Sequence, residues 1–311
     1  MTHRAGHIPV LAEEVLALLS VREGGHYLDA TFGGGGHTRL IFGAGANVRV
    51  TALDRDPAAR ERAKALRAEP GVGDRMEFHA LSFADLAQAG GGPYDGILFD
   101  LGVSSFQLDD GERGFSFRYE APLDMRMNPG EGESAAEYLA RADREDLRRA
   151  FSWYGEELHW RRIAEAILAL APEDRPKTTR ALADLVEQVV PRRGPPARIH
   201  PATKIFQGLR IAVNGELEQI EAALPAAFAA LAPGGVLAVI SFHSLEDRMV
   251  KRFARRMCGK PEHRGDSRAQ QEREVQAEDL TRKPIKATEE ERQNNPRSRS
   301  AVLRAIRRLA I

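Results

Sequence analysis

The chain has 311 residues, enough for one large domain or for a domain that carries an insertion. Its 45 basic and 45 acidic residues balance, so no overall positive charge points to nucleic acid. The single cysteine, Cys258, excludes an internal disulfide and any metal site built from several thiolates of one chain. Without an apolar run of about 18 residues or an apolar signal core, we expect a cytoplasmic protein with no membrane span.

Strand-like segments alternate with helical ones near both ends of the chain. We expect helices over residues 10–19, from His37 onward and over 58–68, with strands over 27–30, 48–53, 76–80 and 94–100. Later we expect a long helix over 202–231 that breaks near Pro225, a strand over 236–242, a helix over 244–257 and a final strand over 300–306. This alternation predicts a doubly wound, mainly parallel α/β sheet.

The middle of the chain interrupts the alternation. Residues 101–129 have no clean period, and helices are expected over 143–151, 156–170 and 179–190. Ser134 and Glu137 form a capping-box signature ahead of these helices. We therefore expect one domain over 1–106 and 200–311, and an inserted helical domain over 107–199. Residues 259–299 are polar and are predicted to form a long loop.

Four consecutive glycines, residues 33–36, separate the first strand from a helix, which is how open α/β sheets bind nucleotide-like ligands. A dinucleotide site needs G-x-G-x-x-G, but the third glycine would fall on Thr38 or Arg39. The P-loop pattern G-x-x-x-x-G-K-[ST] is also absent. A ligand with adenosine but no phosphate fits better, and S-adenosylmethionine is the common one.

Two carboxylates follow strands at positions that suit such a ligand. Asp54 lies about 20 residues after the glycines, where a carboxylate accepts hydrogen bonds from ribose hydroxyls; the alternative is a solvated turn before Pro57. Asp100 ends the fourth strand, beside the reacting centre of such a sheet. Phe83 follows the third strand and could pack on adenine, although by itself it is better explained as a core residue.

The residues around Asp100 limit the chemistry. Methylation of carbon 5 of a pyrimidine needs a cysteine nucleophile, and residues 98–102 contain none. Transfer to nitrogen or oxygen remains, because a carboxylate can orient an amine and support its developing charge, with Ser241 or His243 nearby. His243 and Glu246 have H-x-x-E spacing, but without an evident third ligand we predict no metal site.

Local charge is uneven despite the neutral total. The last 20 residues contain arginines but no acid: Arg292, Arg297, Arg299, Arg304, Arg307 and Arg308. The helix expected over 244–257 has a basic face: Arg248, Lys251, Arg252, Arg255 and Arg256. Both groups could contact phosphates, although on charge alone a solvated surface is the simpler explanation.

Several longer motifs occur in order through nearly the whole chain. They include Asp29-Ala-Thr-Phe-Gly-Gly-Gly-Gly-His37, Asp54-Arg-Asp-Pro57, Asp100-Leu-Gly-Val-Ser-Ser-Phe-Gln-Leu-Asp-Asp110, Arg113-Gly-Phe-Ser-Phe117, Pro122-Leu-Asp-Met-Arg-Met127, Ser241-Phe-His-Ser-Leu-Glu-Asp-Arg248 and Asn295-Pro-Arg-Ser-Arg299. Together they resemble the bacterial 16S rRNA (cytidine-N4) methyltransferases of the MraW or RsmH type. Phe106 departs from that family, whose members often have proline there.

The resemblance implies a class I S-adenosylmethionine-dependent methyltransferase with a Rossmann-like sheet and an inserted all-helical domain that recognises the substrate. It implies cofactor contacts at Gly35, Gly36, His37, Asp54, Phe83, Asp100 and Gln107. The substrate of the family is a cytidine in the decoding region of 16S rRNA, in the small ribosomal subunit. From their positions after strands four and five, Asp100, Ser241 and His243 are our catalytic candidates.

Candidate RNA contacts come from the motifs and the basic segments: Arg113, Phe115, Arg126, Arg248, Arg252, Arg297 and Arg299. Structural salt bridges are a nearly equal explanation for those near residue 113. We expect a monomer or homodimer that acts on the small subunit and not at a membrane. Two other functions stay open: methylation of a small molecule or a protein, and non-catalytic RNA binding with S-adenosylmethionine held as a ligand.

Overall fold

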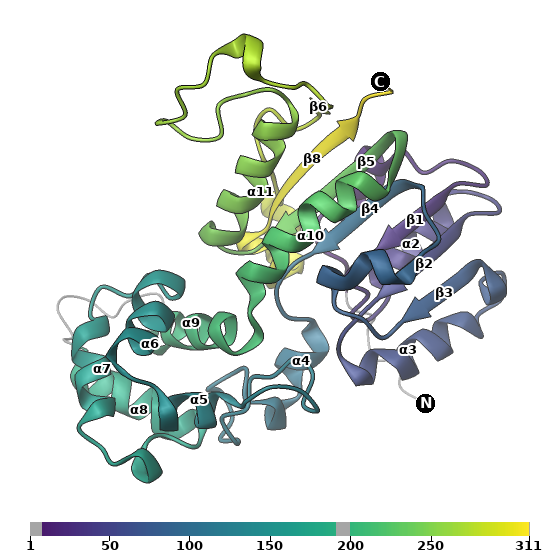
Figure 1. The fold of residues 1–311 in the computed structure, drawn as a ribbon. Helices are drawn as coiled ribbons and strands as arrows, with labels where there is room; N and C mark the ends of the chain where they lie inside the picture. The colour runs from purple at the N-terminus through teal and green to yellow at the C-terminus, as the bar shows by residue number, and fades with distance from the viewer. Residues whose placement is uncertain (1–7, 191–199, 311) are drawn as a thin grey trace. The chain divides into compact units, whose positions relative to one another are not determined.

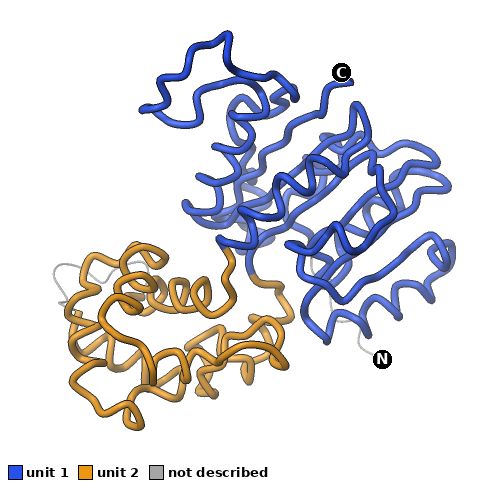
Figure 2. Tube along the Cα trace, in the orientation of Figure 1, with its two compact units in different colours: residues 1–102, 217–311 blue, residues 103–216 orange. Residues whose placement is uncertain are grey.

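The computed structural model describes residues 8–190 and 200–310, which form two compact units (Figure 2). The first unit comprises residues 1–102 and 217–311, and the second comprises residues 103–216. Our expected boundaries lie at 106/107 and 199/200, and residue 199 is outside the described part of the chain. Among the described helices, none combines the length and the apolar character that a bilayer crossing needs.

The first unit is built on an eight-stranded sheet (Figure 1). Its strands are β1 (His26–Asp29), β2 (Arg49–Leu53), β3 (Met76–His79), β4 (Tyr94–Asp100), β5 (Leu231–Ser241), β6 (Ala277–Asp279), β7 (Ile285–Lys286) and β8 (Val302–Arg308). The order is β3-β2-β1-β4-β5-β8-β6, with β7 also paired to β8. Strands β1 to β5 are parallel and β8 is antiparallel to β5. The predicted doubly wound, mainly parallel sheet is confirmed.

Both faces of this sheet are covered by helices. These are α1 (Ala12–Leu19), α2 (Gly36–Ala44), α3 (Pro57–Arg67), α10 (Glu216–Ala230) and α11 (Ser244–Met257). The unit also contains α12 (Glu289–Asn294) and short 3₁₀ turns at Gly73–Arg75, Phe83–Ala89, Gln270–Glu272 and Pro296–Ser300. Alternate residues of β4 enter different clusters: Ile97 and Phe99 pack with α10 and α11, while Leu98 packs with α1 and α2. Successive residues of β4 point to opposite faces and both faces are covered, which explains why the sequence of β4 is a continuous apolar run.

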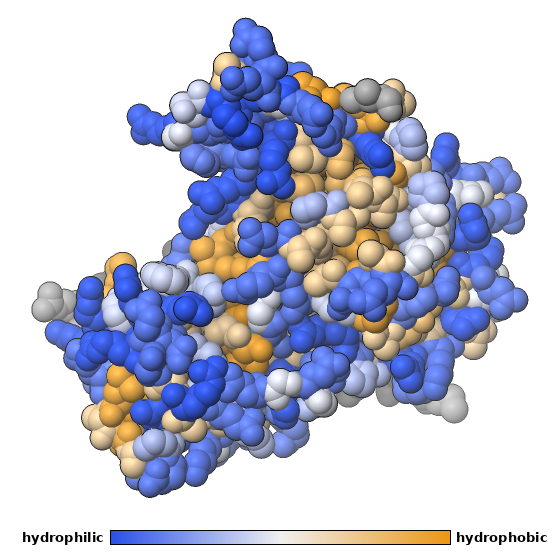
Figure 3. Space-filling view, in the orientation of Figure 1, coloured by the Kyte–Doolittle hydropathy of each residue, from blue (hydrophilic) through white to orange (hydrophobic). Residues whose placement is uncertain are grey.

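The expected break near Pro225 is wrong. The helix instead divides at Gly215, which has φ 59° and ends α9 (Ala202–Asn214) in the left-handed conformation that glycine favours. Pro225 lies inside α10, on its exposed side, where water can satisfy the carbonyl that loses its partner. The exposed residues of α10 include small apolar ones such as Ala222 and Ala229, which contribute to an apolar stretch of the surface (Figure 3), and also the acidic Glu218 and Glu221.

The prediction of a long loop over residues 259–299 is also wrong in part. This segment contains β6, β7 and α12, and both strands pair with β8. Strands of three and two residues carry no readable period, so their pairing with β8 is what defines them.

The second unit is helical. Its elements are α4 (Ser105–Asp109), α5 (Ala135–Arg141), α6 (Arg144–Arg148), the π-helix η4 (Arg149–Tyr154), α7 (Trp160–Leu168), α8 (Thr179–Val189) and α9, with 3₁₀ turns at Gly111–Arg113 and Pro172–Asp174. The capping box of Ser134 and Glu137 is confirmed at the start of α5. A single cluster of buried apolar side chains, including Leu139, Phe151 and Ile163, forms the core.

Candidate active site

The carboxyl ends of the parallel strands gather the polar side chains of the first unit. Asp29 ends β1, Asp100 ends β4 and Ser241 ends β5, while Asp54 follows the last residue of β2. Strand order reverses between β1 and β4, and ligands of open α/β sheets bind outside the carboxyl ends at such a switch point. These residues therefore lie at the edge of the sheet where the strand pattern predicts them.

Hydrogen bonds from two sides hold the glycine loop between β1 and α2. The Gly33 N–H donates to Oδ2 of Asp54 at 2.7 Å, and Nε of Arg62 donates to the Gly33 carbonyl at 2.7 Å. Gly35 precedes α2 with φ 74°, a conformation that glycine adopts without strain, and no side chain of the described residues caps the helix. The first N–H groups of α2 are therefore available to a ligand.

Asp29 ties the end of β1 to the first turn of α2. Its Oδ2 accepts the hydroxyl hydrogen of Thr38 at 2.7 Å, and its Oδ1 accepts the N–H of Thr31 at 3.2 Å. The side chain is buried, and burial raises the pKa of Asp29 to about 6. Sequence reasoning missed this role, although an aspartate that ends an apolar strand, as Asp100 does, was a usable signal.

Asp100 and His37 face each other beside the glycine loop. Burial raises the pKa of Asp100 to about 8, and repulsion from Asp29 and Glu246 adds to the rise. Oδ1 of Asp100 has no hydrogen-bond partner within the described residues, and Oδ2 lies 3.7 Å from Nε2 of His37. Neither ring nitrogen of His37 has a hydrogen-bond partner in the described part of the chain, and burial lowers the pKa of His37 to about 4. The imidazole is therefore neutral at physiological pH.

The arrangement fits a cationic ligand that also carries hydroxyl groups. Burial is the main reason why the pKa values of Asp29 and Asp54 rise to about 6 and that of Asp100 to about 8. A cation placed among these carboxyl groups would favour their ionised forms and would gain affinity in return. Asp54 already accepts the N–H groups of Gly33 and Asp56, but each carboxylate oxygen has a second lone pair for a hydroxyl.

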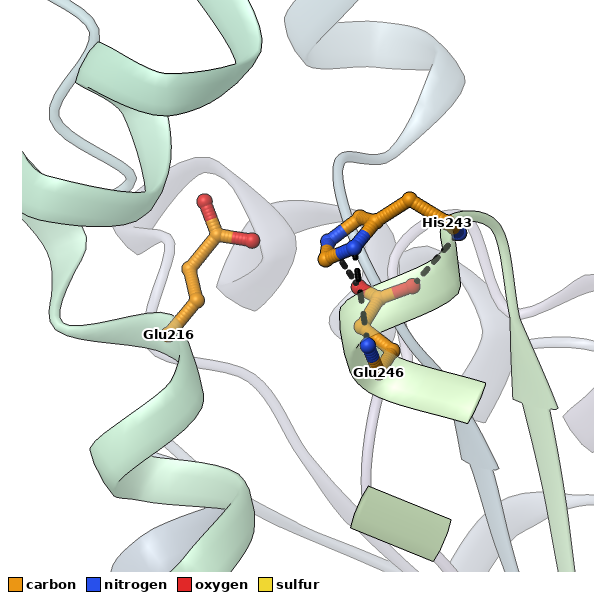
Figure 4. Close-up of side chains that lie close together, drawn as sticks. All are labelled: Glu216, His243 and Glu246. Carbon is orange, nitrogen blue, oxygen red and sulfur yellow. Dashed lines mark hydrogen bonds and ion pairs between the residues drawn. The ribbon is translucent and has the colours of Figure 1, made fainter. Parts of the chain in front are cut away.

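His243 and Glu246 form the capping box that starts α11 (Figure 4). The Glu246 N–H donates to Nδ1 of His243 at 3.5 Å, and Oε2 of Glu246 accepts the N–H groups of Phe242 at 2.7 Å and His243 at 3.1 Å. Glu216, also drawn in Figure 4, is counted with the second unit, where its carboxylate accepts hydrogen bonds from Arg210 at 2.7 and 2.8 Å. The start of α11 alone accounts for the H-x-x-E spacing.

Phe83 and Gln107 belong to different units. Phe83 begins the 3₁₀ turn after β3 and packs edge-on against Phe99 of β4, with ring centroids 5.6 Å apart. Gln107 lies in α4 of the second unit, where its Oε1 accepts the N–H of Ser104 at 2.9 Å in a capping box. A core contact and a helix cap thus explain these two residues locally, and their cofactor roles stay predictions.

The candidate RNA contacts of the second unit have structural partners. Arg126 forms a bidentate pair with Asp124, at 2.9 and 2.7 Å. Nη2 of Arg113 donates to the carbonyls of Arg126 at 3.0 Å and Met127 at 2.9 Å. Phe115 is buried in the core of this unit. These contacts support the structural explanation, so RNA binding by the three residues stays a prediction.

Much of the C-terminal positive charge is neutralised within the first unit. Arg304 pairs with Asp247 at 2.6 and 3.1 Å, and Arg307 pairs with Glu278 at 2.8 Å. By contrast, Arg252 on the outer side of α11 is exposed and forms no ion pair within the described residues. The other candidates outside the second unit are Arg248 and Arg299, which are exposed, and Arg297, which is half-buried.

Comparisons with known proteins identify the family. The model of the MraW methylase family matches residues 4–309. "Ribosomal RNA small subunit methyltransferase H" of Gluconobacter oxydans is 48% identical over 307 residues, covering 97% of this chain and 93% of the relative. The protein of the same name from Nitrobacter hamburgensis is 49% identical over 311 residues, covering 98% of this chain and 91% of the relative.

The solved structures are more distant. A putative rRNA-methylase from Clostridium thermocellum is 12% identical with a TM-score of 0.45, covering 97% of this chain and 96% of that one. A putative methyltransferase from Streptococcus mutans in complex with SAH is 12% identical with a TM-score of 0.43, covering 97% of this chain and 99% of that one. The family match and the curated relatives span almost the full length of the sequence. The chain therefore belongs to the MraW methylase family.

Proposed function

We propose that this protein transfers a methyl group from S-adenosylmethionine to the exocyclic N4 of a cytidine in the decoding region of 16S rRNA. The relatives named above are small-subunit ribosomal RNA methyltransferases at about 48% identity. The observation that carries the proposal is a group of poorly solvated carboxyl groups around a glycine loop at the switch point of the sheet: Asp29, which is buried, and Asp54 and Asp100, which are half-buried. The substrate would place the protein with small ribosomal subunits in the cytoplasm.

The proposed cofactor site combines the loop with the carboxyl groups. S-adenosylmethionine would supply an electrophilic methyl group on a positively charged sulfur. Asp54 would accept hydrogen bonds from the ribose hydroxyls, while Gly35, Gly36 and His37 would contact the cofactor at the start of α2. Asp100 and Phe83 complete the proposed contacts of the first unit, and the contact of Gln107 stays a prediction from its place in the family motif. The positive charge of the cofactor favours the ionised carboxylates, whose charge burial otherwise opposes.

Asp100 is the proposed catalytic carboxylate. An exocyclic amine is conjugated with the ring and is a weak nucleophile, so it needs orientation and support for the charge that it develops. Oδ1 of Asp100, which has no hydrogen-bond partner within the described residues, can accept a hydrogen bond from that amine. As the nitrogen–carbon bond forms and the sulfur–carbon bond breaks, the amine gives up one proton, which the carboxylate can take and pass to water.

Ser241 and His243 have supporting roles in this proposal. Ser241 is buried at the end of β5, next in the sheet to β4, which carries Asp100. His243 fixes the start of α11 together with Glu246, whose charge adds to the high pKa of Asp100. The two residues would therefore shape the surroundings of Asp100. We further propose that the second unit recognises the rRNA.

The test is methyl transfer to small subunits isolated from a strain that lacks the enzyme. Radiolabelled S-adenosylmethionine should label 16S rRNA, and nuclease mapping should place the label on the N4 of one cytidine. Small subunits from the parent strain, which already carry the modification, should take up little label. Label in a ribosomal protein or in a small molecule, with none in the rRNA, would overturn the proposal.

A further inference from the structure

The residues just before α1 pack against the glycine loop. A Cβ atom at Gly36 would lie 2.8 Å from Cγ of Pro9, so Pro9 lies against the backbone where α2 begins. Two residues further on, Leu11 is fully buried and has φ 53° and ψ 40°, a left-handed conformation that is strained for leucine. Such a conformation persists only where surrounding contacts fix it.

Two residues from near the other end of the chain supply polar contacts to this segment. Oε1 of Glu291 accepts the N–H of Leu11 at 2.8 Å, and Nδ2 of Asn295 donates to the carbonyl of Ile8 at 3.0 Å. Leu11 precedes α1 and its own side chain offers no cap, and the Glu291 carboxylate lies at the positive end of the helix, where it accepts the N–H of Leu11 itself.

The segment that carries these two residues is itself well anchored. Oγ1 of Thr288 accepts the N–H of Glu291 at 3.1 Å at the start of α12, and the buried Ser298 donates its hydroxyl hydrogen to the Asn295 carbonyl at 2.9 Å. Apolar contacts reinforce the connection, because Ala287 and Ala301, which flank the segment, share one buried cluster with Leu11.

We propose that residues 288–300 form a clasp that positions the cofactor loop. Glu291 and Asn295 hold residues 8–11, and Pro9 in turn supports the backbone at Gly36. The inference rests on the proposed placement of S-adenosylmethionine at the glycine loop. Glu291 and Asn295 are positioning residues in this account, since they act on the cofactor only through the residues that they hold.

The test measures the dissociation constant of S-adenosylhomocysteine by isothermal titration calorimetry, together with the thermal midpoint of each full-length variant. Asn295→Ala removes the donor to Ile8 and should weaken binding about fivefold to tenfold, while the midpoint falls by only a few degrees. Glu291→Ala should behave alike, whereas Glu291→Gln keeps an oxygen acceptor and should retain most of the affinity. Glu290→Ala, an exposed neighbour in α12, is the matched control and should change neither quantity.

A double-mutant cycle tests whether the effect passes through Pro9. In a Pro9→Ala background, Asn295→Ala should weaken binding less than twofold further, because the contact that it supports is already lost. Fully additive losses, or an affinity of Asn295→Ala within twofold of the parent, would overturn the clasp. Asp54→Asn separates the two proposals. If Asp54→Asn weakens binding and Asn295→Ala does not, only the clasp fails, whereas unchanged binding in Asp54→Asn refutes the placement of the cofactor.

Discussion

The two units differ in how they treat buried polar groups. In the second unit such groups are used to satisfy the backbone: Nδ2 of Asn214 donates to the Met125 carbonyl at 2.7 Å, and its Oδ1 accepts the Met127 N–H at 2.8 Å. In the first unit, His37 and Asp100 retain atoms without a hydrogen-bond partner among the described residues. Buried polar atoms of this kind cost stability, so their presence in a folded protein calls for a functional reason.

The two interiors can therefore be distinguished: the first unit has a reactive interior, with polar atoms left for chemistry, and the second has a supporting interior, whose polar groups bind the backbone. Arg175 of the second unit illustrates the supporting kind, because its Nη1 donates to three carbonyls, of Leu139, Ala140 and Ala142, at the end of α5. Its Nε is the one buried side-chain nitrogen or oxygen in the described part of this unit that lacks a partner. Under the proposed function, the second unit would therefore bind RNA with its surface, whereas the chemistry would take place among the inner polar groups of the first unit.

The largest expected effect comes from the reactive interior. Asp100→Asn keeps the size of the side chain but removes its charge and its capacity to take a proton. Methyl transfer to small subunits should fall at least about a hundredfold, the usual scale for the loss of a positioned acid–base group. S-adenosylhomocysteine should still bind, as judged by calorimetry.

The control for this variant is Asp74→Asn, which changes an exposed carboxylate of the same unit and should leave turnover unchanged. Near-parental turnover by Asp100→Asn, with normal cofactor affinity, would remove Asp100 from the mechanism and weaken the contrast between the two interiors.

The next effect is on stability and should be confined to the second unit. Asn214→Ala leaves the Met127 N–H and the Met125 carbonyl buried without their partner, at a cost of about 2–4 kcal/mol. Hydrogen exchange should show faster opening of this unit, while the affinity of the first unit for S-adenosylhomocysteine stays within twofold. Gln188→Ala, exposed on α8, is the control and should change neither. An equal loss of protection in both units would show that their stabilities are coupled.

Strand ends and helix starts that depend on neighbouring residues could be predicted from the sequence. The end of β2 just before Asp54 and the end of β4 at Asp100 follow from apolar runs that stop at a carboxylate, and the start of α5 follows from the Ser134 capping box. Pro225 misled the prediction because a proline on an exposed helix face costs less than one whose carbonyl partner is buried. The H-x-x-E spacing of His243 was ambiguous, since capping boxes and metal sites both use such spacing.

Contacts between distant residues could not be predicted in this way. The hydrogen bond from Leu11 to Glu291 joins residues 280 apart, and nothing near either residue marks the other as its partner. The same holds for Asp100, because its high pKa depends on burial and on Asp29 and Glu246, which only the fold brings near. The residue types at the site were readable from the sequence, whereas their electrostatic state was not.

A smaller effect concerns the pH dependence of stability. The pKa of Asp100 is raised from 3.8 to about 8, so the folded protein holds this proton more tightly than the unfolded chain does. The stability that this proton contributes is complete below about pH 4 and is lost as the pH rises through about 8. Asp100→Asn should therefore raise the thermal midpoint by a few degrees at pH 8.5 and by much less at pH 5. Equal shifts at both pH values would contradict a raised pKa.

The smallest expected effect tests where RNA contacts the surface. Arg252 is exposed on α11 and has no ion-pair partner among the described residues, so a phosphate can approach it without breaking an internal pair. If it contacts one phosphate, Arg252→Gln should lower the slope of log affinity for rRNA against log salt concentration by about 0.7–0.9, because one fewer counterion is released. Arg304 offers the matching contrast: its guanidinium is bound to Asp247, so Arg304→Gln should reduce stability and leave the salt slope unchanged. Arg60→Gln, which removes an exposed charge from α3, controls for the general effect of net charge. A slope that falls equally in Arg252→Gln and Arg60→Gln would mean that net charge, and not a contact on α11, sets the affinity for RNA.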